Sequence, residues 1–137
     1  KSYLLFHIFQ NYLLKQDIPA SHIIAIELDQ RKNRKYREPD TILDYIESLI
    51  TDNAPYYILL DEVQMLQDFE EVLNSLLHIG NADIYVTGSN SKFLSKDVIT
   101  EFRGRGDEIH IFPLICSPLH SLATFRSKFL QTSRILI

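Results

Sequence analysis

Short apolar runs alternate with segments of helical periodicity along the chain, and this alternation restricts the fold more than any other feature. Runs rich in β-branched or aromatic side chains cover residues 22–28, 56–60 and 83–87, as expected for buried strands. Between them, apolar side chains recur at helical spacing over residues 42–50 and 69–77. Strands that alternate with helices in this way predict an α/β fold, a layered sandwich built around a mainly parallel sheet.

Further elements are predicted on both sides of this central region. An apolar stripe over residues 2–16 indicates a helix before the first strand. A helix over residues 92–102 and a strand over 108–112 are expected after the last of the three runs. The basic, polar stretch 31–37 is interpreted as a loop.

Capping residues mark the starts of two predicted helices. Asp40 is a candidate N-cap for the helix over 42–50. Asp68, followed three residues later by Glu71, resembles a capping box for the helix over 69–77.

Composition limits the classes of function that fit the chain. Its 137 residues match one domain, and the net charge of -4 argues against a protein that coats nucleic acid by bulk charge. A single cysteine, Cys116, excludes an intrachain disulfide and favours a reducing compartment. We therefore expect a cytoplasmic protein. No apolar run approaches the ~20 residues that span a bilayer, so no membrane interaction is expected.

The strongest candidate for chemistry is a pair of carboxylates after a predicted central strand. The run 56–60 ends on Asp61 and Glu62, and ligands of open parallel sheets bind beyond the carboxyl ends of the strands. A nucleoside triphosphatase uses such carboxylates to hold Mg²⁺ and to orient or deprotonate the attacking water. The alternative is that both are ordinary acidic residues of a loop.

The first two residues carry a weaker signal for nucleotide binding. Lys1 and Ser2 precede an amphipathic helix and match the end of the phosphate-loop motif GxxxxGK[ST]. In that motif the lysine reaches the β- and γ-phosphates and the hydroxyl ligates Mg²⁺. The first glycine of the chain is Gly80, so the glycines that cradle the phosphates are absent.

Three segments together carry a family resemblance: YYILLDEVQ (56–64), IYVTGSNSKFL (84–94) and FRGRGDEIHIFPL (102–114). They are similar to prokaryotic ATP-binding proteins of the AAA+ superfamily, often called the AAA domain 14 group. The resemblance covers residues 1–114 and implies a P-loop NTPase sandwich of the AAA+ type that binds ATP with Mg²⁺ and hydrolyses ATP. Members commonly carry a nuclease-like domain after the ATPase. Their phosphate loop follows a central strand. The resemblance therefore implies that the sequence starts inside the phosphate loop, lacks the first central strand and, as it stands, binds ATP poorly or not at all.

The resemblance also implies a role for each matching residue of the nucleotide site. Lys1 and Ser2 correspond to the last two Walker A residues, and Asp61 and Glu62 correspond to Walker B. Ser2 and Asp61 are then the implied partners of Mg²⁺. Glu62 is the implied catalytic base.

Two further matches lie after the strand over residues 83–87. Ser89 or Asn90 falls where the family has a sensor 1 residue that touches the γ-phosphate or the attacking water. Arg105 matches the family's Gly-Arg before the final strand, and its implied role is to stabilise charge in the transition state. Whether it acts on its own site or on a neighbour's is left open by the resemblance.

The end of the chain departs from the family pattern. The family has a segment of the form Leu-Ser-Phe-x-Glu after the last strand, whereas here Pro113 and Leu114 are followed by Ile-Cys-Ser-Pro. No Asp or Glu occurs between residues 109 and 137. We therefore expect residues 1–114 to be a partial AAA+ ATPase core and residues 115–137 to be a divergent or degenerate tail. An ordinary divergent linker is the alternative.

Other classes of function are also compatible with these patterns. A non-catalytic interaction module, or a remnant of a decayed gene, would keep the fold without nucleotide chemistry. An α/β nucleic-acid-binding domain is a third reading, in which the cations of the segment 31–37 contact phosphates, and its alternative is a solvated loop. The cations of that segment are Arg31, Lys32, Arg34, Lys35 and Arg37.

Overall fold

The computed structural model describes residues 2–88 and 135–136 of the chain. Within these residues the strands form one sheet in the order β1-β2-β3-β4, and each neighbouring pair is parallel. The parallel α/β fold predicted from the alternating runs is therefore confirmed. The bounds of the strands are Ile23–Glu27 for β1, Tyr56–Asp61 for β2, Ala82–Val86 for β3 and Ile135–Leu136 for β4.

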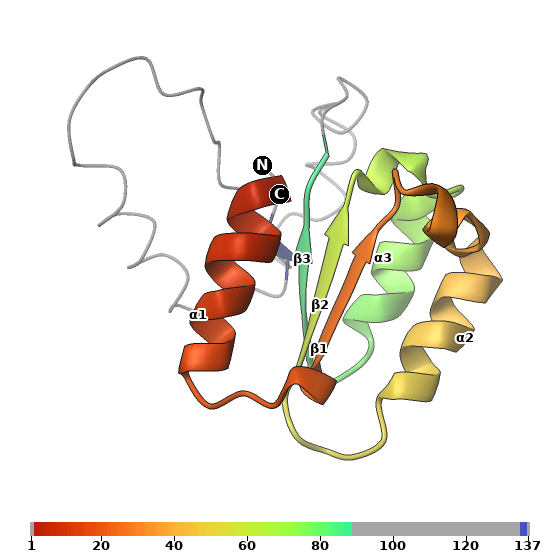
Figure 1. The fold of residues 1–137 in the computed structure, drawn as a ribbon. Helices are drawn as coiled ribbons and strands as arrows, with labels where there is room; N and C mark the ends of the chain where they lie inside the picture. The colour runs from red at the N-terminus through yellow and green to blue at the C-terminus, as the bar shows by residue number, and fades with distance from the viewer. Residues whose placement is uncertain (1, 89–134, 137) are drawn as a thin grey trace, which may run out of the picture.

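Helices cover both faces of the sheet (Figure 1). One face carries a helix made of a π-helical part, η1 (Leu4–Phe9), followed by α1 (Gln10–Lys15). The other face carries α2 (Pro39–Leu49) and α3 (Phe69–Leu77). This is the expected three-layer sandwich, and β1, the first described strand, follows the first helix rather than preceding it. None of the described helices combines the length and the apolar character needed to cross a bilayer.

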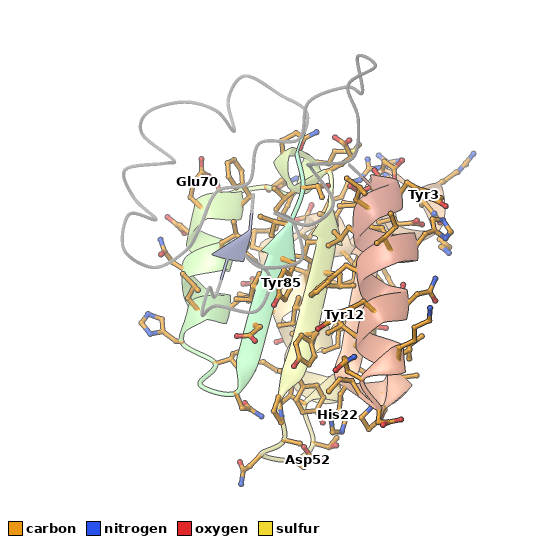
Figure 2. All side chains as sticks on the ribbon, turned by 90° about the vertical axis from the view of Figure 1, so that its left-hand side faces the viewer. Tyr3, Tyr12, His22, Asp52, Glu70 and Tyr85 are labelled. Atoms are coloured by element: carbon orange, nitrogen blue, oxygen red, sulfur yellow. The ribbon has the colours of Figure 1, made fainter. Side chains whose placement is uncertain are left out.

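The first helix packs on the sheet through a narrow apolar stripe. The rings of Phe9 and Tyr85 lie 4.4 Å apart between centroids, and Figure 2 shows Tyr85 and Tyr12 on the face of the sheet that this helix covers. The buried positions of the helix recur every fourth residue, and Phe6 and Tyr12 are partly buried beside them. Ile8 lies within the predicted stripe but is 39% exposed. The buried residues on this side are Leu5, Phe9, Leu13, Ile23, Leu59 and Tyr85.

A second, larger core lies between the other face of the sheet and α2 and α3. Ile46 of α2 and Leu73 of α3 are fully buried there against Ile58 and Leu60 of β2. Leu59, between those two strand residues, belongs instead to the core under the first helix. Alternate side chains of β2 therefore fill opposite cores, as the geometry of a central strand requires.

The starts of α2 and α3 differ from the predicted caps. The helix α2 begins at Pro39, which places Asp40 inside its first turn instead of at the N-cap. Asp68 does occupy the N-cap position of α3, but its side chain makes no cap hydrogen bond. The reason is its left-handed backbone, with φ of 46°, whereas a capping side chain normally extends from a β-type backbone. The predicted capping box is therefore wrong.

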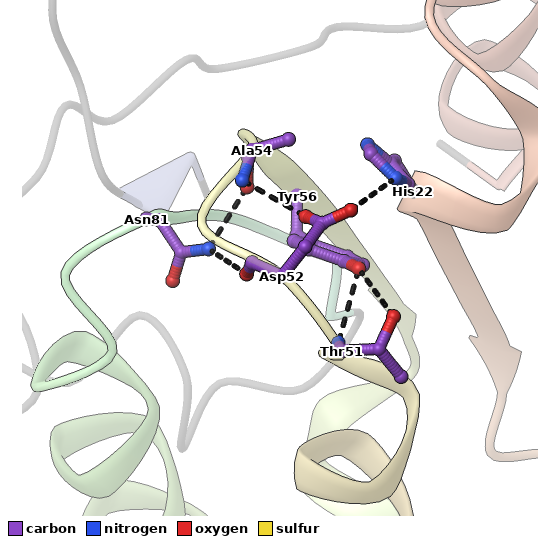
Figure 3. A network of polar contacts seen from close by, with 6 residues as sticks. All are labelled: His22, Thr51, Asp52, Ala54, Tyr56 and Asn81. Carbon is purple, nitrogen blue, oxygen red and sulfur yellow. Dashed lines mark hydrogen bonds and ion pairs between the residues drawn. The ribbon is translucent and has the colours of Figure 1, made fainter.

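A polar network, hereafter the amino-end clasp, joins the loops at the amino ends of the strands (Figure 3). Asn81 Nδ2, just before β3, donates to the carbonyl oxygens of Asp52 at 3.0 Å and Ala54 at 2.8 Å. The Asp52 carboxylate accepts a hydrogen bond from Ala54 N at 2.9 Å and lies 3.5 Å from His22 Nε2. His22 precedes β1 and stacks on Tyr56, the first residue of β2. The clasp thus links the starts of three neighbouring strands.

Part of the predicted architecture lies outside the described residues. This applies to the helix expected over 92–102, to the strand expected over 108–112 and, apart from β4, to the tail 115–137. The division of the chain at residue 114 therefore stays a prediction.

Candidate functional site

Two polar side chains are buried together at the carboxyl ends of neighbouring strands. Asp61, the last residue of β2, is 3% exposed, and Thr87, directly after β3, is 9% exposed. Among the described residues, these are the buried side chains that are polar or charged. The Thr87 hydroxyl donates a hydrogen bond to Oδ1 of Asp61. Burying a carboxylate is costly, and the hydrogen bond from Thr87 offsets part of that cost at Asp61.

Backbone hydrogen bonds continue the pairing of β2 and β3 past the strand ends and fix Thr87 in place. Thr87 N donates to the carbonyl of Leu60, and Val63 N donates to the carbonyl of Thr87, each at 2.9 Å. Glu62 N also approaches the Thr87 hydroxyl oxygen at 3.4 Å. Thr87 therefore connects the carboxylate of Asp61 with the backbone of Glu62. The sequence prediction missed Thr87, although the signal was present, since polar residues that end adjacent parallel strands converge at one edge.

Glu62 has a backbone conformation that is unusual for its residue type. Its φ of 53° and ψ of 47° are left-handed, and the residue is half-buried. A non-glycine residue pays about 1–2 kcal/mol for this conformation, and such outliers cluster at active sites. The left-handed turn ends β2 abruptly and leads into a short 3-10 helix, η4 (Val63–Met65). Of these two consecutive acidic residues, Asp61 is therefore buried at the end of the strand and Glu62 is half-buried in the turn.

The side chain of Gln64 holds the carboxylate of Glu62. Gln64 Nε2 donates a hydrogen bond to Oε2 of Glu62. Both residues are half-buried, so the bond is partly shielded from water. Sequence reasoning did not single out Gln64, because its role depends on the left-handed turn at Glu62 that brings the two side chains together.

The other predicted site residues are distributed as follows. Ser2 is half-buried in the helical turn that leads into η1. Figure 1 shows the N-terminal end of this helix at the end of the sheet toward which the strand arrows point, the same end as Asp61. Four predicted residues lie outside the described part of the chain, namely Lys1, Ser89, Asn90 and Arg105.

The donor set at this edge fits Mg²⁺ only with help from a bound phosphate. Within residues 2–88 and 135–136, no group of three His, Cys, Asp or Glu side chains is arranged to hold a metal ion. Mg²⁺ in nucleotide enzymes is typically held by one or two carboxylates together with substrate phosphates and water. One buried carboxylate, Asp61, at the carboxyl end of a central strand agrees with that kind of site.

Comparison with known proteins gives two curated relatives of similar sequence. An uncharacterized protein of Haemophilus influenzae is 30% identical over 115 residues, which cover 83% of this chain and 28% of that protein. An uncharacterized protein of Methanocaldococcus jannaschii is 26% identical over 118 residues, covering 83% of this chain and 24% of that protein. The chain thus spans about a quarter of the length of these relatives. No solved structure matches the chain.

A family model gives the broader assignment. The model described as an AAA domain matches residues 1–119. This range includes the first helix, β1 to β3 and the buried pair of Asp61 and Thr87. The parallel sheet, helices on both faces and a carboxylate at the end of a central strand agree with that match, and the chain belongs to the AAA domain family.

Proposed function

We propose that the protein containing this chain binds ATP with Mg²⁺ and hydrolyses it to ADP and phosphate. The AAA domain match supports nucleotide binding in general. The observation that carries the finer proposal is the strand end at which a buried Asp61, hydrogen-bonded by Thr87, is followed by a left-handed Glu62. In this proposal Asp61 serves a metal-bound phosphate, and Glu62, the more exposed of the two, serves the attacking water.

In the proposed reaction the two carboxylates have different tasks. Glu62 accepts a proton from a water molecule whose oxygen attacks the γ-phosphorus, the bond to the bridging oxygen breaks, and ADP leaves. Mg²⁺, held by Asp61 and Ser2, would supply neutralisation of phosphate charge. Lys1 would contact the β- and γ-phosphates. Arg105, with Ser89 or Asn90, would stabilise the transferring group; for these residues the proposal rests on the family resemblance.

Gln64 is a positioning residue in this scheme. Its amide donates to Oε2 of Glu62 and therefore restricts the orientation of that carboxylate. Thr87 has the same relation to Asp61, because its hydroxyl donates to Oδ1. Each carboxylate thus has one oxygen held by a hydrogen bond from a neighbouring polar side chain.

We further propose that nucleotide state changes contacts with a partner protein or with a nuclease-like domain, as the family resemblance implies, and that the protein acts in the cytoplasm. A two-state response to nucleotide needs a segment that connects the phosphate site with a distant surface. The segment from Glu62 to Gln67 connects two such places in this structure. It begins at the carboxylates, and at its end Gln67 N donates to the Arg37 carbonyl at 3.0 Å, outside the sheet.

The test is ATP turnover by the longest natural polypeptide that contains these 137 residues. Glu62→Gln is expected to retain binding of a fluorescent ATP analogue and to lose turnover by about 10²-fold or more, because the proton acceptor is removed while the shape is kept. Glu71→Gln is the matched control, since it makes the same change on an exposed position of α3. Turnover should be unchanged in that control.

Two outcomes contradict the proposal. Normal turnover in Glu62→Gln would exclude Glu62 as the base. A parent protein that binds no MgATP in calorimetry would exclude the nucleotide chemistry altogether and would favour the alternative of a non-catalytic interaction module.

A further inference from the structure

The basic segment predicted to be a loop is a short helix with a regular pattern of exposure. Residues Arg31–Arg37 form a 3-10 helix, η3. In such a helix residues three apart lie above one another, and the rise is about 2.0 Å per residue. Asn33 and Tyr36, three residues apart, are half-buried and form the inward row of the helix. Four cationic residues of the helix are exposed: Arg31, Lys32, Arg34 and Lys35.

The inward row and the last residue of η3 attach the helix firmly to the sheet. Asn33 Nδ2 donates to the carbonyl oxygen of Glu27, the last residue of β1, at 2.9 Å. Arg37 donates through Nε to the Leu28 carbonyl at 2.8 Å and through Nη2 to the Asp29 carbonyl at 3.2 Å. The ring of Tyr36 stacks on Tyr45 of α2, with centroids 4.4 Å apart. Arg37 is therefore a structural residue, and these contacts hold in place the helix that carries the four other cations.

Positively charged side chains are concentrated in η3. Five of the six Lys and Arg residues between positions 2 and 88 lie in η3, and the sixth is Lys15. Among the described residues, the contact within ion-pair distance joins His22 to Asp52, at the other end of the sheet, so none of the exposed cations of η3 forms a close ion pair with a described carboxylate. The acidic neighbours Asp29 and Glu38 flank the helix; Glu38 accepts a hydrogen bond from Gln67 Nε2 at 3.1 Å.

We propose that η3 binds the phosphate backbone of nucleic acid, without reading its sequence. Its exposed rows hold Arg31 with Arg34 and Lys32 with Lys35, and the backbone positions within a row lie about 6 Å apart along the helix. The Lys35 Nζ lies 4.7 Å from the centre of the Tyr36 ring. This regular spacing of cationic residues matches the regularly spaced phosphates of a nucleic acid better than the irregularly spaced acidic side chains of a protein surface. Guanidinium groups bind phosphate oxygens in a bidentate manner, which lysine does not. Contacts of this kind fix position but carry no base information.

The same residues argue against a membrane surface as the partner. Helices that lie on bilayers insert an apolar face between the headgroups. The outward positions of η3 are all charged, and its aromatic residue, Tyr36, packs toward α2.

Binding at η3 requires no nucleotide chemistry at Asp61 or Glu62. This proposal can therefore be tested separately from the proposed ATPase function.

The test measures binding of a fluorescein-labelled 30-base-pair DNA duplex by the full-length protein across a range of salt concentrations. Replacing Arg31, Lys32, Arg34 and Lys35 by Gln is expected to weaken binding at least tenfold at low salt. The slope of log affinity against log salt should become flatter by about 0.9 for each phosphate that the variant no longer neutralises. Because all four side chains are exposed, the circular dichroism of this variant should match that of the parent.

Single-charge variants provide the matched control. Lys32→Gln and Lys15→Gln each remove one exposed lysine, but only the first lies in η3. Lys32→Gln should weaken duplex binding and Lys15→Gln should not. This comparison decides the question even if the fourfold variant fails to fold.

Several results would overturn the proposal. They are no duplex binding by the parent protein, a salt response that is flat or unchanged in the fourfold variant, or equal weakening by Lys32→Gln and Lys15→Gln. Binding to phosphatidylserine vesicles with no binding to the duplex would also overturn it and would assign the patch to a membrane surface.

Discussion

At the scale of single residues, Thr87 joins the buried carboxylate of Asp61 to the backbone that carries Glu62. Thr87→Val keeps the shape but removes the hydroxyl. We expect the free energy of unfolding to fall by about 1–3 kcal/mol, because a buried acceptor loses its partner. Urea denaturation at pH 7 measures the change.

Thr87→Ser is the control for this prediction, since it keeps the hydroxyl and removes only a methyl group. It should cost less than Thr87→Val. The reverse order of stability would show that packing of the methyl group, and not the hydrogen bond to Asp61, is what matters at this position.

The residues of the site were partly predictable from sequence. Asp61 and Glu62 were identified because an apolar run that ends in two acids is conspicuous. Thr87 and Gln64 were missed because threonine and glutamine are common at strand ends and in loops. Their importance comes from the pairing of β2 with β3 and from the left-handed turn at Glu62, and both are properties of the folded chain.

At the scale of elements, the amino-end clasp offers a direct test of how the strands are held together. Asn81→Ala removes two hydrogen bonds from its side chain to the carbonyls of Asp52 and Ala54. The expected loss is about 1–2 kcal/mol in the free energy of unfolding. The urea midpoint should fall while the slope of the transition stays the same.

Asn53→Ala is the matched control for the clasp, because Asn53 lies in the same loop and is exposed. It should leave the midpoint close to that of the parent. Equal losses in the two variants would mean that the loop responds to any substitution and that the hydrogen bonds of Asn81 have no special weight.

The apolar strands were predicted well from the sequence, whereas the short, charged helix η3 was not. The strands β1, β2 and β3 lie within a residue or two of the predicted runs, because their burial on both faces leaves continuous apolar sequence. The helix η3 was expected to be a loop because its pattern is one of charge, not of hydrophobicity. Its contacts with the Glu27, Leu28 and Asp29 carbonyls stabilise it as a helix, and these depend on the folded chain.

At the scale of the whole molecule, the parallel register determines which polar groups meet. Glu27 pairs with Asp61 in neighbouring strands, and Leu60 pairs with Val86, so the strands end together at one edge. Sequence alone predicts such an edge from the order of elements. It does not predict the pairing of β4 with Ile84 and Tyr85, because that contact joins segments separated by about fifty residues and follows no local pattern.

Tyr85, in the core under the first helix, leads us to predict how the free energy of unfolding changes at alkaline pH. Burial raises the pKa of Tyr85 above the usual 10.0, and the charges of Asp83 and Tyr57 raise it further. The folded protein therefore favours the neutral phenol, while the unfolded chain releases the proton near pH 10.0. The resulting stabilisation is fully present below that pH and is lost as the pH rises above it.

The expected result is a free energy of unfolding that falls above pH 10 by at most about 1.4 kcal/mol per pH unit from this group. Tyr85→Phe should flatten that fall, because phenylalanine has no proton to release. Tyr3→Phe, at a ring that is 67% exposed, should leave the slope as in the parent. Urea denaturation between pH 8 and pH 11 measures all three proteins. If Tyr85→Phe keeps the parental slope, the alkaline loss of stability originates elsewhere, and the core between the first helix and β3 is more open to water than the packing of Phe9 against Tyr85 implies.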